Sequence, residues 1–124
     1  MNMNQIIMNS TDIAKSKQFY TALGFSLIVD TDHYLRFACP DDGPTFSLSL
    51  ADKASEGMSV YFEEPDLDNK VAQLIQQGIE FEHGPEDRPY LWREAVLSDP
   101  SGNKLVLYWA GDNRLNPPWR VIKN

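Results

Sequence analysis

The feature of this sequence that most constrains its fold is a repeated spacing of aspartate and glycine around two helix-like segments. Asp12 precedes Gly24 by 12 residues, and Asp66 precedes Gly78 by the same 12 residues, so the two segments are offset by 54. Aspartate caps the free N–H groups of a first helical turn, and glycine adopts the left-handed conformation that ends a helix. Two copies are too few for a solenoid, so the repeat predicts a duplicated module.

Each predicted helix carries an apolar stripe and stands between runs that read as β-strands. The stripes are Ile13, Ser16, Phe19 or Tyr20 and Leu23 in the first helix, and Leu67, Val71 and Leu74 in the second. The predicted strands are Gln5–Met8, Phe25–Val29, Tyr34–Ala38 and Thr45–Leu50 in the first copy, and Met58–Phe62, Ile79–Glu82, Trp92–Ser98 and Lys104–Trp109 in the second. Turns are expected at Asp41–Pro44 and Asp99–Asn103.

These elements predict an α+β fold built from two tandem βαβββ modules. Module one spans residues 1–52 and module two spans residues 57–110, with residues 111–124 as an irregular tail. We expect residues 1–110 to form a single domain.

Charge and cysteine content exclude several classes of function. The chain has 11 Lys and Arg against 18 Asp and Glu, a net charge of −7, and therefore lacks the basic surface that nucleic acids and anionic membranes require. Cys39 is the single cysteine, so no intrachain disulfide can form, and we expect it to be a small residue in or near the core. No signal peptide or membrane-spanning run is visible, which predicts a cytoplasmic protein.

The duplicated module resembles the vicinal oxygen chelate superfamily, which includes glyoxalase I, extradiol dioxygenases and bleomycin-resistance proteins. The similarity covers about residues 3–110. It is carried by Asp12, Lys15-Ser16, Phe19-Tyr20 and Leu23-Gly24-Phe25, and by Asp66-Leu67-Asp68, Gly78-Ile79-Glu80-Phe81, Arg93-Glu94-Ala95 and Asp99-Pro100-Ser101-Gly102-Asn103. The resemblance implies that the two sheets form an open cup, with helices outside and the ligand inside.

The resemblance also implies where a metal site would lie, on the first and last strand of each module. These positions fall on Gln5, on Ser47 (or Ser49, two residues on), on Ser59 and on Val106. Transition metals need imidazole, carboxylate or thiolate ligands, and only Gln5 offers a usable oxygen. We therefore expect no metal and no other cofactor. The two histidines, His33 and His83, are isolated and are expected at the surface.

Strand alternation extends these positions to a predicted ligand-binding face. Its members combine hydroxyl, amide, carboxylate and aromatic groups, as a pocket wall does: Gln5, Ile7, Ser47, Ser49, Ser59, Tyr61, Glu63, Trp92, Val106 and Tyr108. The alternate residues are uniformly apolar and are expected to face the helices: Ile6, Met8, Phe46, Leu48, Val60, Phe62, Leu105 and Leu107.

The sequence leaves some placements open. Trp92 and Arg36 join the wall only if their strands have the required parity. Trp119 either closes over the cup or packs at a subunit contact. Arg93 and Glu94 are interpreted as members of a cross-strand ion pair.

The preferred hypothesis is a metal-independent, homodimeric binding protein that resembles bleomycin-resistance proteins. It would sequester an aromatic or cationic small molecule in a cup or dimer cleft, as in antibiotic resistance, with no catalytic residue. The alternative is a glyoxalase-type metal-dependent lyase or isomerase, or a dioxygenase. Acid–base chemistry by Glu63 with Tyr61 or Tyr108, and a regulatory domain without any ligand, also stay open.

Overall fold

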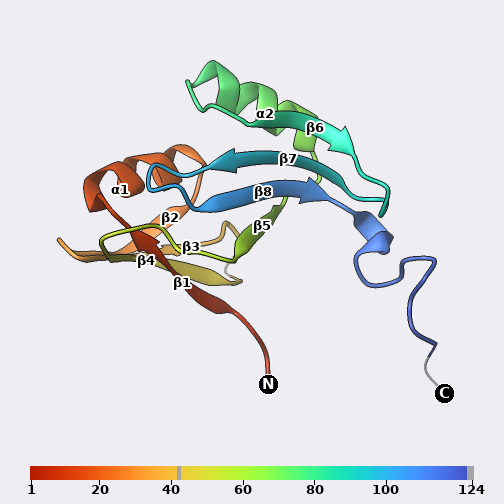
Figure 1. The fold of residues 1–124 in the computed structure, drawn as a ribbon, viewed down its shortest axis with the longest axis horizontal. Helices are drawn as coiled ribbons and strands as arrows, with labels where there is room; N and C mark the ends of the chain where they lie inside the picture. The colour runs from red at the N-terminus through yellow and green to blue at the C-terminus, as the bar shows by residue number, and fades with distance from the viewer. Residues whose placement is uncertain (42, 123–124) are drawn as a thin grey trace. The chain divides into compact units, whose positions relative to one another are not determined.

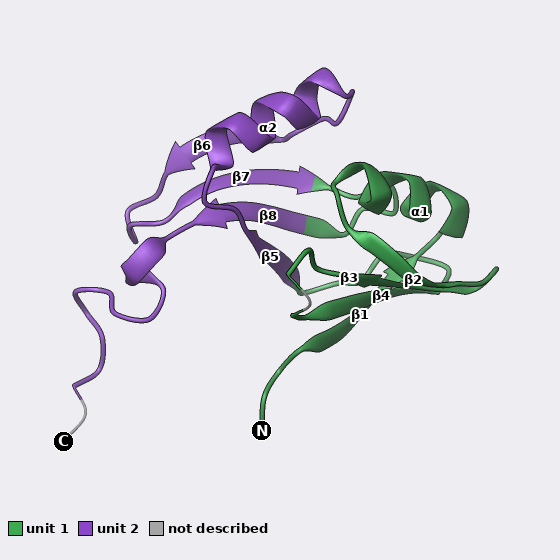
Figure 2. Ribbon diagram, turned by 180° about the vertical axis from the view of Figure 1, so that it is seen from behind, with its two compact units in different colours: residues 1–58, 98–104 green, residues 59–97, 105–124 purple. Residues whose placement is uncertain are grey.

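The computed structural model describes residues 1–41 and 43–122, and this part of the chain divides into two compact units. Unit 1 comprises residues 1–58 together with residues 98–104, and unit 2 comprises residues 59–97 and the chain from residue 105 onward (Figure 2). No helix in the described residues is long and apolar enough to cross a membrane. Asp42, in the predicted turn at residues 41–44, lies outside the described residues.

Unit 1 is an open four-stranded mixed sheet with one helix on one face (Figure 1). Its elements are β1 (Gln5–Ser10), α1 (Ile13–Ala22), β2 (Ser26–Asp30), β3 (Tyr34–Ala38) and β4 (Thr45–Leu50). The strand order is β1-β4-β3-β2, with β1 parallel to β4 and the other neighbours antiparallel. The predicted βαβββ order of module one is confirmed.

Residues at its two ends determine where α1 begins and ends, and its buried side packs on the sheet. The Asp12 carboxylate accepts a hydrogen bond from the Lys15 backbone N–H at 3.0 Å, which is the predicted cap. Gly24 has φ 103° and ends the helix in the left-handed conformation. The fully buried ring of Tyr20 lies 5.7 Å from that of Phe37 and 5.1 Å from that of Phe46, so aromatic packing holds α1 to β3 and β4.

Unit 2 repeats this arrangement. Its elements are β5 (Ser59–Glu63), α2 (Leu67–Gln76), β6 (His83–Asp87), β7 (Arg93–Ser98), β8 (Lys104–Trp109) and the short 3-10 helix η1 (Gly111–Asn113). The strand order β5-β8-β7-β6 matches that of the first sheet element for element. All three predicted stripe residues of α2 are buried: Leu67, Val71 and Leu74. The second βαβββ module is therefore confirmed, and with it the α+β fold.

One predicted strand is wrong. Ile79–Glu82 was expected to be the strand after the second helix, but the strand of this position is β6, His83–Asp87. The Ile79 backbone N–H donates to the Leu74 carbonyl at 3.0 Å, so it closes the end of α2 and does not join the sheet. Pro85 made the true strand hard to recognise, yet β6 is an edge strand, where a missing N–H is tolerated.

The predicted cap of the second helix is also wrong. Asp66 precedes α2, but its side chain accepts no hydrogen bond from the helix backbone. Its φ of −103° and ψ of 53° lie outside the extended conformation of a capping residue, and its carboxylate instead accepts from the Asn69 side-chain amide at 3.0 Å.

The turn between β7 and β8 belongs to unit 1 because its polar side chains are hydrogen-bonded there. Asp99 is buried and accepts from the Tyr20 hydroxyl at 2.7 Å and from the backbone N–H groups of Ser101 and Asn103 at 3.0 and 2.9 Å. The Asn103 amide donates to the Asn9 carbonyl of β1 at 2.7 Å. The predicted turn is thus present and also anchors unit 1.

Candidate functional site

The face of the unit 1 sheet that lies opposite α1 carries the predicted residues of module one. The strand register pairs Ile7 with Ser47 and Ser47 with Arg36, so these three side chains share a face. Gln5 and Ser49 lie on the same face by alternation. Arg36, whose parity the sequence left open, therefore joins this group.

A hydrogen-bond network centres on Ser47, which is fully buried. The Ser47 hydroxyl lies 2.5 Å from the Tyr34 hydroxyl and accepts from Gln5 Nε2 at 2.8 Å. Arg36 donates to the Tyr34 hydroxyl through Nε at 3.2 Å and Nη2 at 2.9 Å. The bond to Ser47, together with those from Arg36, lowers the pKa of the Tyr34 phenol. Tyr34 was not among the predicted site residues.

The residues at the metal positions that the resemblance implies do not fit a transition metal. The Gln5 side-chain oxygen accepts a hydrogen bond from the Thr45 hydroxyl, and Ser47 is engaged in the network above. Ser59 offers only an exposed neutral hydroxyl, and Val106 is buried and has no donor atom. Within residues 1–41 and 43–122, no group of three or more His, Cys, Asp or Glu side chains could hold a metal ion.

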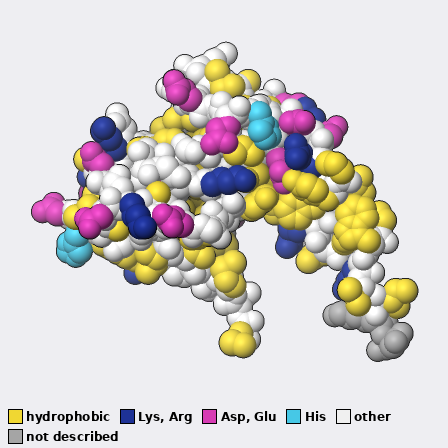
Figure 3. All heavy atoms as spheres, viewed as in Figure 1, with side chains coloured by type: hydrophobic (Ala, Val, Ile, Leu, Met, Phe, Trp, Pro, Cys, Tyr) yellow, Lys and Arg dark blue, Asp and Glu magenta, His cyan; other side chains and the backbone are white. Residues whose placement is uncertain are grey.

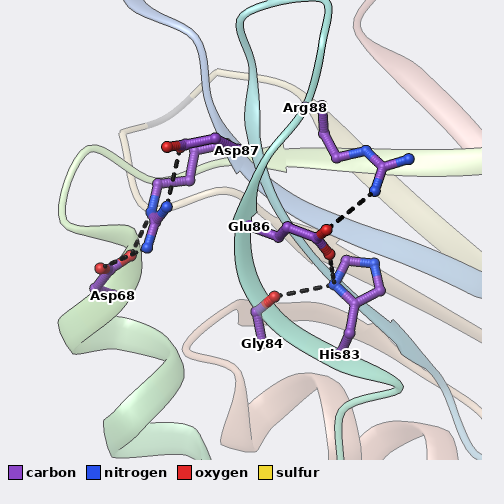
Figure 4. Close-up of polar contacts among 7 residues, drawn as sticks. Asp68, His83, Gly84, Glu86, Asp87 and Arg88 are labelled. Atoms are coloured by element: carbon purple, nitrogen blue, oxygen red, sulfur yellow. Dashed lines mark hydrogen bonds and ion pairs between the residues drawn. The ribbon is translucent and has the colours of Figure 1, made fainter.

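The two histidines lie apart from these positions. His33 is exposed in the chain between β2 and β3. His83 Nδ1 lies 2.9 Å from the Gly84 carbonyl oxygen and 3.8 Å from Glu86 Oε2, and Glu86 in turn lies 3.7 Å from Arg88 Nη1 (Figure 4). This row of contacts runs along the edge strand β6.

In unit 2, three predicted residues form one aromatic cluster, which we call the aromatic face: Tyr61, Trp92 and Tyr108. The rings of Trp92 and Tyr108 are stacked with centroids 4.6 Å apart. The Tyr61 ring meets both edge-on, 5.8 Å from Trp92 and 5.6 Å from Tyr108. Tyr108 is buried with Val106, whereas Tyr61 is 45% exposed. Tyr108 thus forms the buried side of the cluster, and Tyr61 forms its solvent-accessible side.

Sequence reasoning missed Glu94, which lies beside this cluster. Glu94 is only 5% exposed, and one of its oxygens accepts from the Tyr90 hydroxyl at 2.7 Å. Its other oxygen, Oε2, is buried and has no hydrogen-bond partner in the described structure. Strand alternation could have found it, because Trp92 and Glu94 are two residues apart on one extended run.

The predicted cross-strand ion pair holds for Arg93 and fails for Glu94. Arg93 Nη1 contacts Asp87 of the neighbouring strand at 2.9 Å, and Arg93 Nε contacts Asp68 of α2, also at 2.9 Å (Figure 4). Since adjacent residues of a strand point to opposite faces, Glu94 is directed away from α2. Among the described residues, Glu94 forms no ion pair.

The phenols near the aromatic face are held neutral. Burial raises the pKa of Tyr61, and the charge of Glu94 adds to this shift. Burial also raises the pKa of Tyr108, with a smaller contribution from Glu63. Tyr90 has a raised pKa through burial and its hydrogen bond to Glu94. The aromatic face therefore presents uncharged rings beside a carboxylate.

The other predicted residues lie outside these contacts. Glu63 is exposed, and its Oε2 lies 4.0 Å from Arg114 Nε in the tail. Trp119 is 59% exposed in the tail and has no ring contact within the described residues. Cys39 is half-buried, and burial raises the pKa of its thiol.

Comparison with solved structures shows the same fold in proteins of low sequence identity. A bleomycin-binding protein solved in complex with bleomycin is 20% identical, with a TM-score of 0.74 over 88% of this chain and 98% of that chain. A bleomycin resistance determinant encoded on the transposon Tn5 has the same identity, TM-score and coverages. A glyoxalase/bleomycin resistance protein/dioxygenase superfamily member from Sphaerobacter thermophilus DSM 20745 is 24% identical, with a TM-score of 0.75 over 88% of this chain and 97% of that chain.

Comparison with curated protein sequences gave no significant match. The family model of the glyoxalase/bleomycin resistance protein/dioxygenase superfamily matches residues 2–107, which include every strand of both modules except the last two residues of β8. The duplicated βαβββ order and this match together show that the chain belongs to the glyoxalase/bleomycin resistance protein/dioxygenase superfamily.

Proposed function

We propose that this chain is a metal-independent binding protein that sequesters an aromatic or cationic small molecule, as a bleomycin-binding protein does. The observation that carries the proposal is the aromatic face of Tyr61, Trp92 and Tyr108, a stacked and partly accessible aromatic surface. Aromatic walls with few polar groups are typical of small-molecule sites. The net charge of −7 favours a cation over an anion.

Three further parts of the proposal rest on the sequence. Sequestration without chemistry, as in antibiotic resistance, follows from the unsuitable donor set at the metal positions. A ligand bound in the cup or dimer cleft follows from the family resemblance. A cytoplasmic location fits the lone thiol of Cys39.

The test of binding uses bleomycin as the probe in a thermal-shift and calorimetric titration. A ligand that binds only the folded state raises the midpoint of unfolding by mass action. Trp92→Ala is expected to weaken binding about tenfold or more, because it removes the ring stacked on Tyr108. Trp109→Ala is the matched control, since Trp109 is the next residue after Tyr108 and points to the opposite face. Equal binding by both variants would contradict the proposed site.

The test of metal independence is elemental analysis of protein purified without chelator. We expect zinc, nickel, manganese and iron well below one atom per chain, and binding of the probe unchanged after dialysis against EDTA. Stoichiometric metal would overturn this part of the proposal and favour the glyoxalase-type lyase instead. A rise in the unfolding midpoint on addition of metal would also favour the glyoxalase-type lyase.

A further inference from the structure

Glu94 is a buried acidic side chain with half of its hydrogen-bonding capacity unused. It is 5% exposed, and Oε1 accepts from Tyr90 at 2.7 Å, while Oε2 is buried without a donor. A carboxylate oxygen withdrawn from water without a donor is costly, and such atoms in folded proteins nearly always have a partner. We therefore expect a hydrogen-bond donor to bind at Oε2 of Glu94.

The chain's own cations do not fill this position in the described structure. Arg93 lies on the opposite face of β7, between Asp68 and Asp87. Arg88 lies 3.7 Å from the Glu86 carboxylate, and its Nε is buried without a hydrogen-bond partner in the described structure, so Arg88 does not donate to Glu94 there. In the described structure, Oε2 of Glu94 thus receives no hydrogen bond from the cations of the chain.

The surroundings of Glu94 suit a positively charged donor. Trp92 precedes it by two residues on the same face of the strand, and the Tyr61 ring packs edge-on against Trp92 with the ring centroids 5.8 Å apart. The Tyr90 ring, bonded to Glu94, lies 6.3 Å from Trp92. Faces of Trp and Tyr attract cations, and a carboxylate among them adds a direct charge-assisted hydrogen bond.

We propose that Glu94 is the charge anchor of the aromatic face, where its free oxygen accepts a hydrogen bond from an ammonium or guanidinium group of the ligand. This inference rests on the proposed function and specifies it. The ligand would be an aromatic compound with a protonated amine or guanidine beside its ring system. A quaternary ammonium compound lacks the N–H donor and would bind less tightly.

The experiment compares three probes that share a naphthalene ring: 2-naphthylmethylammonium, 2-naphthylmethanol and 2-naphthylmethyl-trimethylammonium. Binding is followed by NMR titration on the indole N–H resonance of Trp92. On the unsubstituted protein, the primary ammonium compound is expected to bind at least about tenfold tighter than the alcohol and tighter than the quaternary compound. Equal affinity for the primary ammonium compound and the alcohol would overturn the inference.

Two variants assign the preference to Glu94. Glu94→Gln keeps the size of the side chain and removes its charge, so it should abolish the preference for the ammonium compound over the alcohol. Glu80→Gln removes an exposed carboxylate of the same unit that lies outside the predicted ligand-binding face, and it should keep the preference. A Glu94→Gln variant that retains the preference would also overturn the inference.

The outcomes separate this inference from the proposed function. If neither the charged nor the neutral probes shift the Trp92 resonance and bleomycin does not bind either, the aromatic face is not a ligand site and both proposals fail. If the alcohol and the ammonium compound bind equally and Trp92→Ala weakens the binding of both in calorimetric titrations, the site stands and the role of Glu94 is wrong. If Glu94→Gln does not fold, the affinities of the unsubstituted protein for the three probes decide whether Glu94 has this role.

Discussion

Asp99 shows how a single buried carboxylate can connect separate segments of unit 1. It accepts hydrogen bonds from Tyr20 of α1 and from the backbone of its own turn, while Asn103 of that turn reaches β1. Burial, followed by the charge and hydrogen bond of Asp99, raises the pKa of Tyr20 far above its ordinary range. Asp99 of the predicted turn and Tyr20 of the predicted helix stripe thus form one buried hydrogen bond.

Removal of the Tyr20 hydroxyl should destabilise the protein. Tyr20→Phe leaves the ring in place but deprives buried Asp99 of a donor, so the free energy of unfolding should fall by about 1–3 kcal/mol. Urea denaturation measures this change. Tyr61→Phe is the control, because the Tyr61 ring is 45% exposed, and its free energy of unfolding should stay within about 0.5 kcal/mol of that of the unsubstituted protein. An equal loss in both variants would contradict the role of the contact.

The same contact predicts a loss of stability at alkaline pH. The pKa of Tyr20 is raised in the folded state, so its contribution is fully present below the unfolded pKa of about 10 and declines as the pH rises above that value. Between about pH 9 and pH 11, the unsubstituted protein should lose more stability than Tyr20→Phe. Parallel curves for the two proteins would contradict this assignment.

Arg36 should contribute to the lowered pKa of Tyr34. The hydrogen bond with Ser47 lowers this pKa most, and the two hydrogen bonds from Arg36 add to the effect, so Arg36→Met should raise the pKa part of the way toward its ordinary value. NMR titration of ring-labelled tyrosine measures the change. Lys17→Met, which removes the exposed contact of Lys17 with Asp30, is the control and should leave the Tyr34 pKa unchanged. If Arg36→Met has no effect, the network does not persist in solution.

At the scale of secondary-structure elements, the two helices end in the same way but begin differently. Gly24 and Gly78 both have positive φ, 103° and 93°, at equivalent positions of the repeat. Asp12 caps its helix through the side chain, whereas Asp66 does not. The repeated aspartate therefore does not have the same role in both modules.

The end of α2 should depend on the backbone freedom of Gly78. A Cβ at Gly78 would meet no atom within 4 Å, so any cost of Gly78→Ala comes from its positive φ alone. We expect a loss of about 1–2 kcal/mol in the free energy of unfolding. Gly84→Ala is the matched control, because that site is equally open but has no positive φ, and it should change stability by less than about 0.5 kcal/mol. Chemical denaturation of both variants measures these changes in the free energy of unfolding.

At the scale of the whole molecule, the exposed apolar side chains favour self-association. Ile7 and Leu50 of unit 1 are 56% and 53% exposed. In unit 2, hydrophobic side chains gather over the chain that follows β8 (Figure 3), and the exposed ones are Leu115, Trp119, Val121 and Ile122. Exposed apolar groups of this extent are typical of interaction surfaces. We propose that the protein is a homodimer, in agreement with the sequence-based expectation.

Light scattering coupled to size-exclusion chromatography tests this proposal. At micromolar concentration, the measured mass should be twice the monomer mass of 14.1 kDa. Trp119→Ser should weaken the dimer if the tail forms part of the contact. Ile75→Ser, at a 53% exposed position on α2, is the control and should leave the mass unchanged. A monomer at all concentrations would contradict the proposal.

The sequence by itself determined the modules, because their signals are local. Helix stripes, terminating glycines and strand alternation act within a few residues and do not depend on what packs against them. The same locality explains the error at Ile79–Glu82. Alternating Ile and Phe with Glu is typical of a strand, but here it belongs to a segment whose first N–H closes a helix. Tyr61 and Tyr108 of the aromatic face were predictable from the alternation of side chains along their own strands, whereas the parity of Trp92 was left open.

Only the tertiary structure decided the roles of Asp99 and Glu94. Both are acidic residues beside polar neighbours in the sequence, where solvent exposure is the usual expectation. Their burial depends on segments distant in the chain, α1 for Asp99 and the packed sheet of unit 2 for Glu94. Desolvation is a property of the assembled surroundings and not of the local chain, so composition and spacing could not reveal which carboxylates lie inside.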